Sequence, residues 1–581
     1  MNKPAVFFLM MHLLYFSAFA QLTPFEKSKN KNVTALYPEA ISFYQALDEK
    51  YPQLKLITAG LTDVGKPLHL AILSRDQNFD PDLIRKKNKR ILLINNGIHP
   101  GEPEGIDASM MLARNLLEKN AIPSDVVICI IPVYNIDGSL NRGVSRINQN
   151  GPESYGFRGN YRNLDLNRDF IKTDSKNSQS FQEIFNLWQP EVMIDNHASN
   201  GSDYQYVITL IKTQKDKLHP VLAGYMEKTI VPELYLKMKK SGFEMTPYVN
   251  AANEIPDGGI EGFLETPRYS TGYAALHNTI AFMPETHMLK PYHQKVEATY
   301  QLMQHVLSTM QRDAKIIDDN KKKADEMVRT QNTFALNWRL DKSQSEQILF
   351  KGYQAKRKAS EVSGLERLYY DRNAPFEKEI SLWDKFIPSV EVSKPVAYIV
   401  PQAWEKVISL LKLNGVAMRQ LNKDEQLDLD MYYIADYKTG TRPYEGHYLH
   451  SNVLLNTVRQ KVRFFEGDYV VYADQVKNRY IVETLEPQGV DSFFAWNFFD
   501  AILNQKEYFS AYIFEEEAVK ILNNDPGLKS RFETEKIKDP QLAKSASAQL
   551  DWIYRYSPYY EKTHMRYPIG RLLDNIKLDF K

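Results

Sequence analysis

The chain has 581 residues, of which 43% are hydrophobic and 25% are charged, and its formal net charge is +1. This length exceeds the usual size of one domain, and the composition is that of a globular protein. The balanced charge argues against a nucleic-acid-binding protein, so we expect no nucleic acid among its partners.

The N-terminus has the pattern of a signal peptide. Lys3 precedes an apolar segment at residues 5–19, and Ala18-Phe19-Ala20 fits the small-x-small cleavage rule. The alternative is an uncleaved membrane anchor, but the segment is short for a span. We therefore expect residues 1–20 to be removed and the mature protein to be exported, either periplasmic or secreted, with no stable membrane span after cleavage.

Short apolar runs alternate with helical stretches through the first half of the chain. Strands are predicted at residues 54–58, 68–73, 91–94, 126–133 and 192–195. Helices are predicted at residues 106–118, at 180–188 with Ser180 as N-cap, and at 296–309. Continuous apolar strands between helices indicate an α/β fold with a mixed, mostly parallel sheet covered by helices. The single cysteine, Cys129, lies within one of these strands, so an intrachain disulfide is excluded.

A second pattern begins after the Lys/Asp-rich stretch at residues 315–326. Alternating polar and apolar residues, as at 347–350, predict a β-rich accessory module. A strand at 396–400, a helix at 404–413 and a strand at 416–421 then form a β-α-β-like unit. The aromatic stretch at 493–499 is interpreted as core. The expected organisation is a signal peptide at 1–20, an α/β domain at 21–325, a β-rich module at 326–393 and a C-terminal α/β domain at 394–581.

Residue types that bind metals follow two of the predicted strands. His99 and Glu102 come directly after the strand at 91–94, and His197 follows the strand at 192–195. The carboxyl ends of parallel strands meet at one edge of a sheet, where ligands bind in open α/β folds. Two histidines and a glutamate, with water as fourth ligand, suit a hydrolytic zinc. We therefore predict one Zn²⁺ per chain, with Asp195 as a weaker candidate to orient a ligand.

Between these ligands lie groups that can recognise negative charge. Arg158 and Arg168 can each bind a carboxylate through two hydrogen bonds, and Asn167 precedes the second arginine. Taken singly, each arginine would be interpreted as a surface residue or a salt bridge.

The order of His99-Pro-Gly-Glu102, Asn135-x-Asp137-Gly138, Arg158, Asn167-Arg168 and His197 resembles the M14 family of zinc metallocarboxypeptidases. The resemblance covers residues 35–310 and implies a carboxypeptidase-like fold for the α/β domain. It also implies hydrolysis of the C-terminal peptide bond of peptides that carry a free C-terminal carboxylate.

The resemblance implies a role for each site residue. His99, Glu102 and His197 would bind zinc, which makes its bound water acidic. Glu285, at the end of the apolar run 279–284, would be the general base, and Arg158 would stabilise the oxyanion. Asn167 and Arg168 would hold the substrate carboxylate. The family often has a mobile tyrosine before the catalytic glutamate, for which both Tyr269 and Tyr273 are candidates.

Several residues near Glu285 leave alternatives open. Glu265 is a rival general base, although no apolar strand precedes it. Arg268 could favour an acidic substrate group or form a structural salt bridge. His277, His287 and His293 are interpreted as packed or exposed histidines.

Two other functions compete with the carboxypeptidase prediction. The first is a zinc amidase or deacylase that acts on cell-wall peptides or N-acyl amino acids, and the second is a non-catalytic binding protein on the same fold. The sequence predicts neither the oligomeric state nor the role of residues after about 330.

Overall fold

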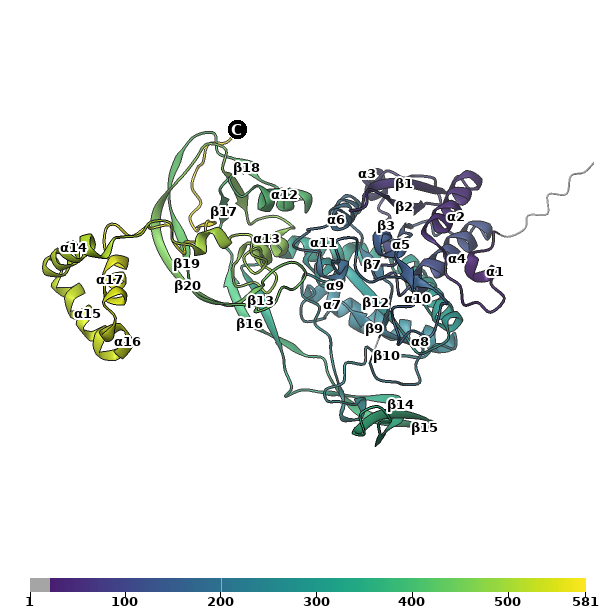
Figure 1. Ribbon diagram of the computed structural model, residues 1–581. Coiled ribbons are helices and arrows are strands. Elements are labelled where there is room, and N and C mark those ends of the chain that lie inside the picture. The colour runs from purple at the N-terminus through teal and green to yellow at the C-terminus, as the bar shows by residue number, and fades with distance from the viewer. Residues whose placement is uncertain (1–20, 200) are drawn as a thin grey trace, which may run out of the picture.

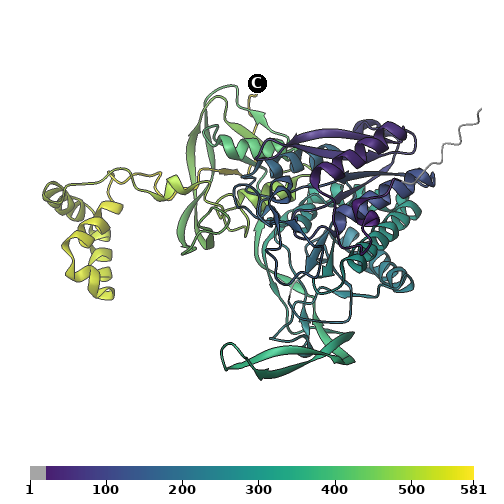
Figure 2. The same ribbon diagram turned by 45° about the vertical axis from the view of Figure 1, so that its right-hand side comes forward.

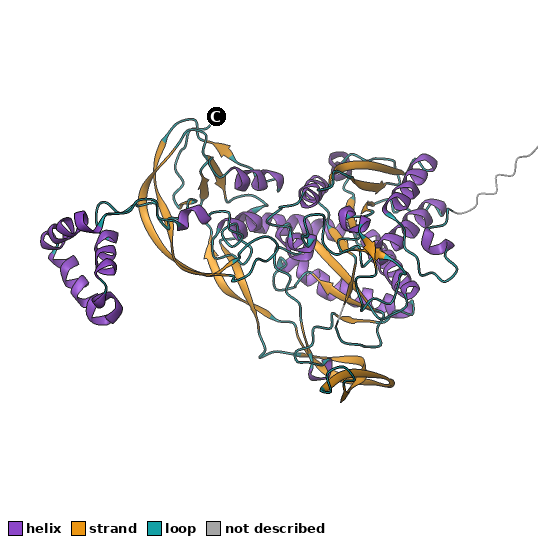
Figure 3. Ribbon diagram, in the orientation of Figure 1, coloured by secondary structure: helices purple, strands orange, loops and turns teal. Residues whose placement is uncertain are grey.

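The computed structural model describes residues 21–199 and 201–581, so the predicted signal peptide lies outside the described residues. Figures 1 and 2 show three parts: a helix-covered sheet, an antiparallel region beside it, and a small group of helices that stands apart from both. Figure 3 shows helices concentrated around the first sheet and long strands in the second region. No helix in these ranges is long and apolar enough to cross a membrane.

The first sheet has nine strands in the order β1-β2-β4-β3-β7-β12-β9-β10, with β8 beside β12. Their bounds are β1 Leu54–Leu61, β2 Pro67–Leu73, β3 Arg90–Asn95, β4 Val126–Ile131, β7 Val192–Asp195, β8 His197–Ser199, β9 Ile208–Lys212, β10 Met245–Pro247 and β12 Ile280–His287. The pairs β3–β4, β3–β7, β7–β12, β8–β12 and β9–β10 are parallel, whereas β1–β2, β2–β4 and β9–β12 are antiparallel. The prediction of a mixed, mostly parallel sheet is confirmed.

Helices cover this sheet, and every residue of β3, β4, β7 and β12 is buried. This explains why these strands are continuous apolar runs rather than alternating ones. Among the larger helices, α4 and α10 pack against each other, and α6 packs on β1. The helices of this part are α1 Pro24–Lys27, α2 Tyr37–Lys50, α3 Pro81–Lys86, α4 Glu104–Glu118, α5 Ile136–Leu140, α6 Lys176–Trp188, α7 Pro220–Tyr225, α8 Val231–Lys240, α9 Ser270–Leu276, α10 Tyr292–Arg312 and α11 Ala314–Thr330, with short turns η1 Leu166–Arg168, η2 Met226–Ile230 and η3 Pro256–Gly258. A small hairpin pairs β5 Arg142–Gly143 with β6 Tyr155–Gly156.

The predicted start of α6 at Ser180 is wrong. The helix begins at Lys176, and Ser175 is its N-cap, because the Ser175 Oγ accepts a hydrogen bond from Ser178 N at 3.0 Å. Ser180 lies inside the helix, where its hydroxyl donates to Leu61 O at 2.8 Å. The polar first turn resembles a loop in sequence, but Asn177 and Ser178 are buried.

Helix α11 runs without a break through residue 325, where the sequence predicts a boundary. Ile317, Ala324 and Val328 are its buried residues, and the helix contacts both β3 and α13 (Asn478–Leu485). It therefore joins the first sheet to the C-terminal region instead of ending the first domain.

The segment after α11 consists of antiparallel strands. β13 (Thr333–Leu340) pairs with β16 (Phe386–Ser393), and β14 (Glu346–Ala359) pairs with β15 (Glu366–Trp383), which also contacts β11 (Ile260–Glu261). The long β14–β15 hairpin reaches the lower edge of the molecule in Figure 1.

The C-terminal sheet has six strands in the order β18-β21-β17-β22-β19-β20, all paired antiparallel. Their bounds are β17 Ala397–Val400, β18 Arg419–Gln420, β19 Glu425–Thr439, β20 His450–Phe464, β21 Tyr469–Tyr472 and β22 Gly570–Leu572, and α12 Glu405–Leu413 follows β17. The strand predicted at 416–421 is shorter than expected, because the backbone of Ala417 bonds to the Gln475 side chain instead of to a strand. Phe493, Phe494 and Trp496 are fully buried, in agreement with their interpretation as core.

The helices that stand apart are α14 Ala511–Asn524, α15 Pro526–Lys538, α16 Pro540–Lys544 and α17 Ala546–Arg555, preceded by η4 Asp500–Leu503. They have a small core of their own, which includes Phe514, Phe532 and Tyr554. After them the chain returns to the C-terminal sheet as β22.

Candidate metal centre and active site

His99, Glu102 and His197 meet at the carboxyl edge of the first sheet, and all three are buried. His99 and Glu102 lie in the turn between β3 and α4, where Glu102 N donates to His99 O at 2.8 Å. His197 is the first residue of β8. The Glu102 carboxylate lies between the two imidazoles, with Oε1 3.4 Å from His99 Nδ1 and Oε2 3.2 Å from His197 Nδ1. One ligand atom from each residue lies within 4.8 Å of the other two.

This donor set fits a zinc ion. His99 Nδ1 is buried and has no hydrogen-bond partner in residues 21–199 and 201–581. The other nitrogen of each imidazole contacts a carboxylate: His99 Nε2 lies 2.9 Å from Asp165 Oδ1, and His197 Nε2 lies 3.0 Å from Asp195 Oδ2. Such contacts orient the ring so that Nδ1 faces the centre. Asp195 thus lies where a ligand-orienting residue is expected, and Asp165 is a second such residue that sequence reasoning missed.

Arg146 is a further residue that the sequence did not reveal. Its guanidinium donates to Glu102 Oε1 at 2.5 Å and to Ala198 O at 3.0 Å. Burial alone would raise the pKa of Glu102, but Arg146 and the two histidines outweigh it and hold that pKa well below its usual range. Glu102 is therefore ionised, as a metal ligand must be.

Arg158, Asn167 and Arg168 lie beside the metal ligands. Arg158 donates to Asp165 Oδ2, with Nε at 3.0 Å, and its NH1 lies 3.5 Å from Glu102 Oε1. Asn167 and Arg168 lie in η1, whose N-cap is Asp165. The Arg168 guanidinium lies 4.2 Å from the centre of the Tyr269 ring. It forms no ion pair with a carboxylate in the part of the chain that the structure describes, so its charge is available to a ligand.

Glu285 lies on β12 directly beside His197 of β8. It is 8% exposed, and its carboxylate makes no hydrogen bond or ion pair with the other described residues. Burial outweighs the opposing charge of the neighbouring His197 and raises the pKa of Glu285 to about 8. A buried carboxyl without a fixed partner beside a metal site is poised to exchange protons.

The structure separates the two tyrosine candidates. Tyr273 is fully buried and donates to Asn414 Oδ1 at 2.6 Å, so it does not face the site, and its prediction as a substrate contact is wrong. Its place in α9 directs it into the core, which spacing alone could not reveal. Tyr269 remains at the site through its contact with Arg168. Tyr248 also lies nearby: burial raises its pKa, and the charge of Glu285 adds to this effect.

The remaining alternatives have partners of their own. Glu265 Oε2 accepts hydrogen bonds from Thr271 N at 3.1 Å and Thr271 Oγ1 at 2.5 Å. Arg268 forms a salt bridge with Asp491 at 2.7 Å, so it is structural. His277 Nδ1 and His287 Nε2 contact Lys477 Nζ and Ser202 O, and His293 lies on α10 outside the metal cluster.

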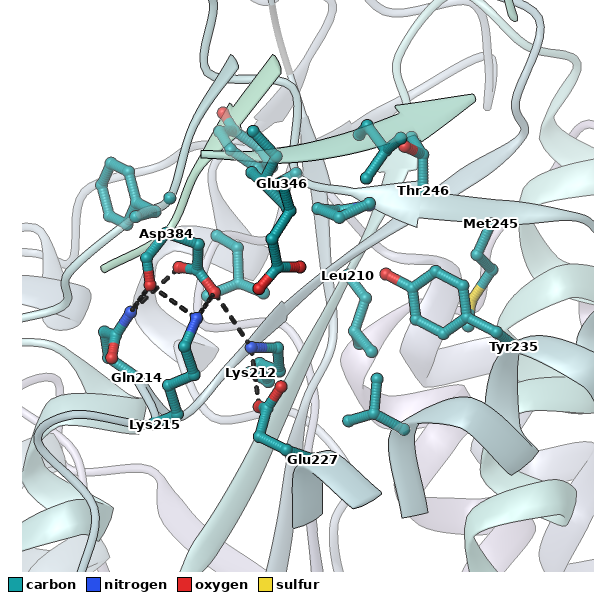
Figure 4. Close-up of a pocket in the computed structure, with 18 of the residues that line it drawn as sticks. Leu210, Lys212, Gln214, Lys215, Glu227, Tyr235, Met245, Thr246, Glu346 and Asp384 are labelled. Carbon is teal, nitrogen blue, oxygen red and sulfur yellow. Dashed lines mark hydrogen bonds and ion pairs between the residues drawn. The ribbon is translucent and has the colours of Figure 1, made fainter. Parts of the chain in front are cut away.

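A cavity of about 460 Å³ lies between β9, β10, α8 and the β14–β15 hairpin. Figure 4 shows Lys212 and Lys215 directed at Asp384, which follows β15, with Lys212 also paired to Glu227. The metal ligands do not line this cavity, although Tyr248 does. Its charged groups pair mainly with one another and hold the accessory hairpin against the first sheet.

Residues 40–225 match the family model described as zinc carboxypeptidase. Carboxypeptidase 2 of Trichophyton rubrum is 19% identical over 428 residues, which cover 69% of this chain and 72% of the relative. Carboxypeptidase 2 of Trichophyton equinum is 21% identical over 430 residues, with the same coverage of each chain.

Residues 40–225 therefore belong to the M14 family of zinc carboxypeptidases. Among solved structures, a putative carboxypeptidase A from Shewanella denitrificans is similar at 15% identity and a TM-score of 0.36, covering 47% of this chain and 69% of that one. A metallo-carboxypeptidase from Pseudomonas aeruginosa is similar at 12% identity and a TM-score of 0.37, covering 50% and 70%. The match makes the protein a metallocarboxypeptidase, and the cluster of His99, Glu102 and His197 is consistent with one zinc ion.

Proposed function

We propose that this carboxypeptidase removes the last residue of peptides that carry a free C-terminal carboxylate, with Glu285 as general base. One juxtaposition supports the proposal most strongly. Asp165 contacts the metal ligand His99 and caps the turn that carries Arg168, so the buried ligand cluster lies near a cation that has no carboxylate partner among the described residues. A peptide end bound between them would present its last amide bond to the centre.

The chain's own residues have separate tasks in this reaction. When bound, zinc would supply a water that is acidic near neutral pH and a Lewis acid for the carbonyl. Glu285 would take the proton from that water and deliver it to the departing amine, and its raised pKa suits both directions of transfer. Arg158 would donate to the oxygen that becomes negative.

Recognition of the peptide end would belong to Asn167 and Arg168. The Asn167 Oδ1 already accepts from Ser270 N at 3.1 Å, which fixes its amide and leaves the NH2 group for the substrate. The Arg168 guanidinium lies over the Tyr269 ring, and a guanidinium positioned in this way can offer two parallel hydrogen bonds to a carboxylate.

The test compares one peptide as a free acid and as a C-terminal amide, with zinc-loaded full-length protein. We expect release of the last residue from the acid only. Arg168→Lys should raise KM for the acid by at least about tenfold, because a bidentate contact is lost. The matched control, Arg162→Lys, changes an exposed arginine of the same loop and should have no such effect. Equal cleavage of both peptides would favour the amidase alternative.

We also propose that the enzyme is exported. The support is the charged, apolar and small-residue pattern of residues 1–20. N-terminal sequencing of the protein recovered outside the cytoplasm should begin at Gln21, and recovery of intact Met1 from the cytoplasm would contradict the proposal.

A further inference from the structure

The loop between β19 and β20 reaches from the C-terminal sheet to the metal centre. Tyr444 and His447 close a four-residue turn, with hydrogen bonds of 2.7 and 3.0 Å between their backbones. The two central residues, Glu445 and Gly446, have φ values of 49° and 82°. This is the pattern of a type I′ turn, and it is unfavourable for a residue with a side chain, such as Glu445. Backbone strain of this kind is concentrated at functional sites.

Glu445 contacts the α/β domain at Asp165, a residue that in turn contacts several groups of the active site. Its Oε2 accepts a hydrogen bond from Asp165 N at 2.7 Å. The side chain of Asp165 contacts His99 Nε2 at 2.9 Å, accepts from Arg158 at 2.9 Å, and caps η1 through Asn167 N at 2.9 Å. A shift of Asp165 would therefore disturb a metal ligand, the oxyanion arginine and the carboxylate-binding turn together.

A second set of contacts holds the other end of the segment 165–174, which begins at Asp165. Asp174 Oδ2 lies 2.6 Å from His447 Nε2, and Asp174 Oδ1 accepts from Lys406 Nζ at 2.7 Å. Both partners belong to the C-terminal region. Residues 165–174 are thus fixed at each end by groups that lie more than 200 positions later in the chain, as the separations of 280 and 232 show.

We propose that Glu445 is a positioning residue of the metal centre, and that the C-terminal region is for this reason a structural part of the active site. Glu445 acts through Asp165, whose backbone it fixes, and it touches none of the three metal ligands. The expected kinetic consequences rest on the proposed function, whereas the consequence for metal binding does not.

The experiment measures zinc affinity by competition with a chelator for the full-length wild type and three variants. Glu445→Ala removes the acceptor, Glu445→Gln keeps an oxygen in the same place, and Arg442→Ala is the control, since Arg442 is exposed in the same loop. We expect Glu445→Ala to weaken zinc binding about tenfold, the lower end for residues that orient a ligand. Glu445→Gln and Arg442→Ala should remain within about twofold of the wild type, because neither loses the hydrogen bond to Asp165.

The kinetic arm uses the free-acid peptide. Glu445→Ala should raise KM more than it lowers kcat, because η1 carries the carboxylate-binding pair, and Glu445→Gln should restore KM. Wild-type zinc affinity in Glu445→Ala would overturn the proposal, and so would equal weakening in the Ala and Gln variants. If the wild-type protein cleaves no peptide, the proposed function fails, but the affinity comparison still decides the role of Glu445.

Discussion

Glu285 and His197 lie side by side on paired strands, so the proton affinity of the base depends on the charge of the metal centre. Glu285→Gln keeps the shape of the side chain and removes its basicity. We expect kcat to fall by at least about 100-fold, as for loss of a general base. Zinc content measured by elemental analysis should stay at one per chain, because Glu285 is not a ligand.

Glu265→Gln provides the comparison for this variant. Glu265 is also buried, but its carboxylate already accepts two hydrogen bonds from Thr271. Replacing the Glu265 carboxylate should therefore lower kcat far less than Glu285→Gln does. The opposite order of effects would transfer the role of base to Glu265.

Substitutions of Tyr269, the N-cap residue of α9, and of Tyr273, inside α9, should have different effects. Tyr273→Phe removes the closer of the two donors that Asn414 Oδ1 has among the described residues and leaves only Asn186 Nδ2 at 3.5 Å, so we expect a loss of about 1–2 kcal/mol in the free energy of unfolding with no change in KM. Tyr269→Ala removes the ring beside Arg168, and a contact of ~0.5–1 kcal/mol should raise KM two- to fivefold. Tyr269→Phe keeps the ring and is the control. Chemical denaturation and steady-state kinetics together check both expectations.

At the scale of single residues, sequence reasoning succeeds where contacts are local or where the topology brings strand ends together. His99 and Glu102 share one turn, and His197 follows the strand beside theirs. Arg146 and Glu445 were missed for a physical reason: they reach the site through long loops, from 44 positions after Glu102 and 280 positions after Asp165. No spacing rule connects residues of that kind.

At the scale of elements, α6 depends on a cap that its sequence conceals. Ser175 Oγ accepts from Ser178 N and donates to Asp169 Oδ2 at 2.6 Å, so the cap also anchors the segment before the helix. Ser175→Ala should lower the free energy of unfolding by about 1–2 kcal/mol. Gln179→Ala, on the exposed face of the same helix, should change it little. Equal stability of both variants in urea titrations would contradict this role.

The predicted elements were most accurate where burial is complete. β3, β4 and β7 are continuous apolar runs because helices cover both faces of the sheet, and the sequence shows such runs directly. The long hairpins were only partly foreseen, since β14 and β15 are largely exposed and carry many charged residues. The continuity of α11 was missed because its polar face outweighs its few buried positions.

At the scale of the whole molecule, a half-buried lysine links the two halves of the chain. Lys477 Nζ lies 3.0 Å from His277 Nδ1 and donates to Asn186 Oδ1 at 2.9 Å, across the contact between α9 and the C-terminal region. Burial and the nearby charge of Lys321 together lower the pKa of Lys477 to about 7. The unfolded chain, in which a lysine has a pKa near 10.4, therefore binds more protons than the folded one between these values.

This difference in protonation fixes the sign of a pH effect. Because the unfolded state binds the extra proton, the free energy of unfolding should rise as the pH increases from 7 to 9.5. Lys477→Met removes this titration, so its stability relative to the wild type should be highest at pH 7 and decline toward pH 9.5. Lys119→Met, at an exposed site, controls for the loss of one positive charge. A constant difference between Lys477→Met and wild type would contradict the expectation.

The position of strand β22 late in the chain affects when the active site can form during translation. It lies between β17 and β19, although the chain reaches it only after leaving the sheet for helices α14–α17. The hairpin that presents Glu445 thus joins the rest of its sheet through residues 570–572. During translation, the zinc-binding half emerges from the ribosome hundreds of residues before this strand exists. The nascent peptidase would therefore complete its active site only after residues 570–572 have been synthesised.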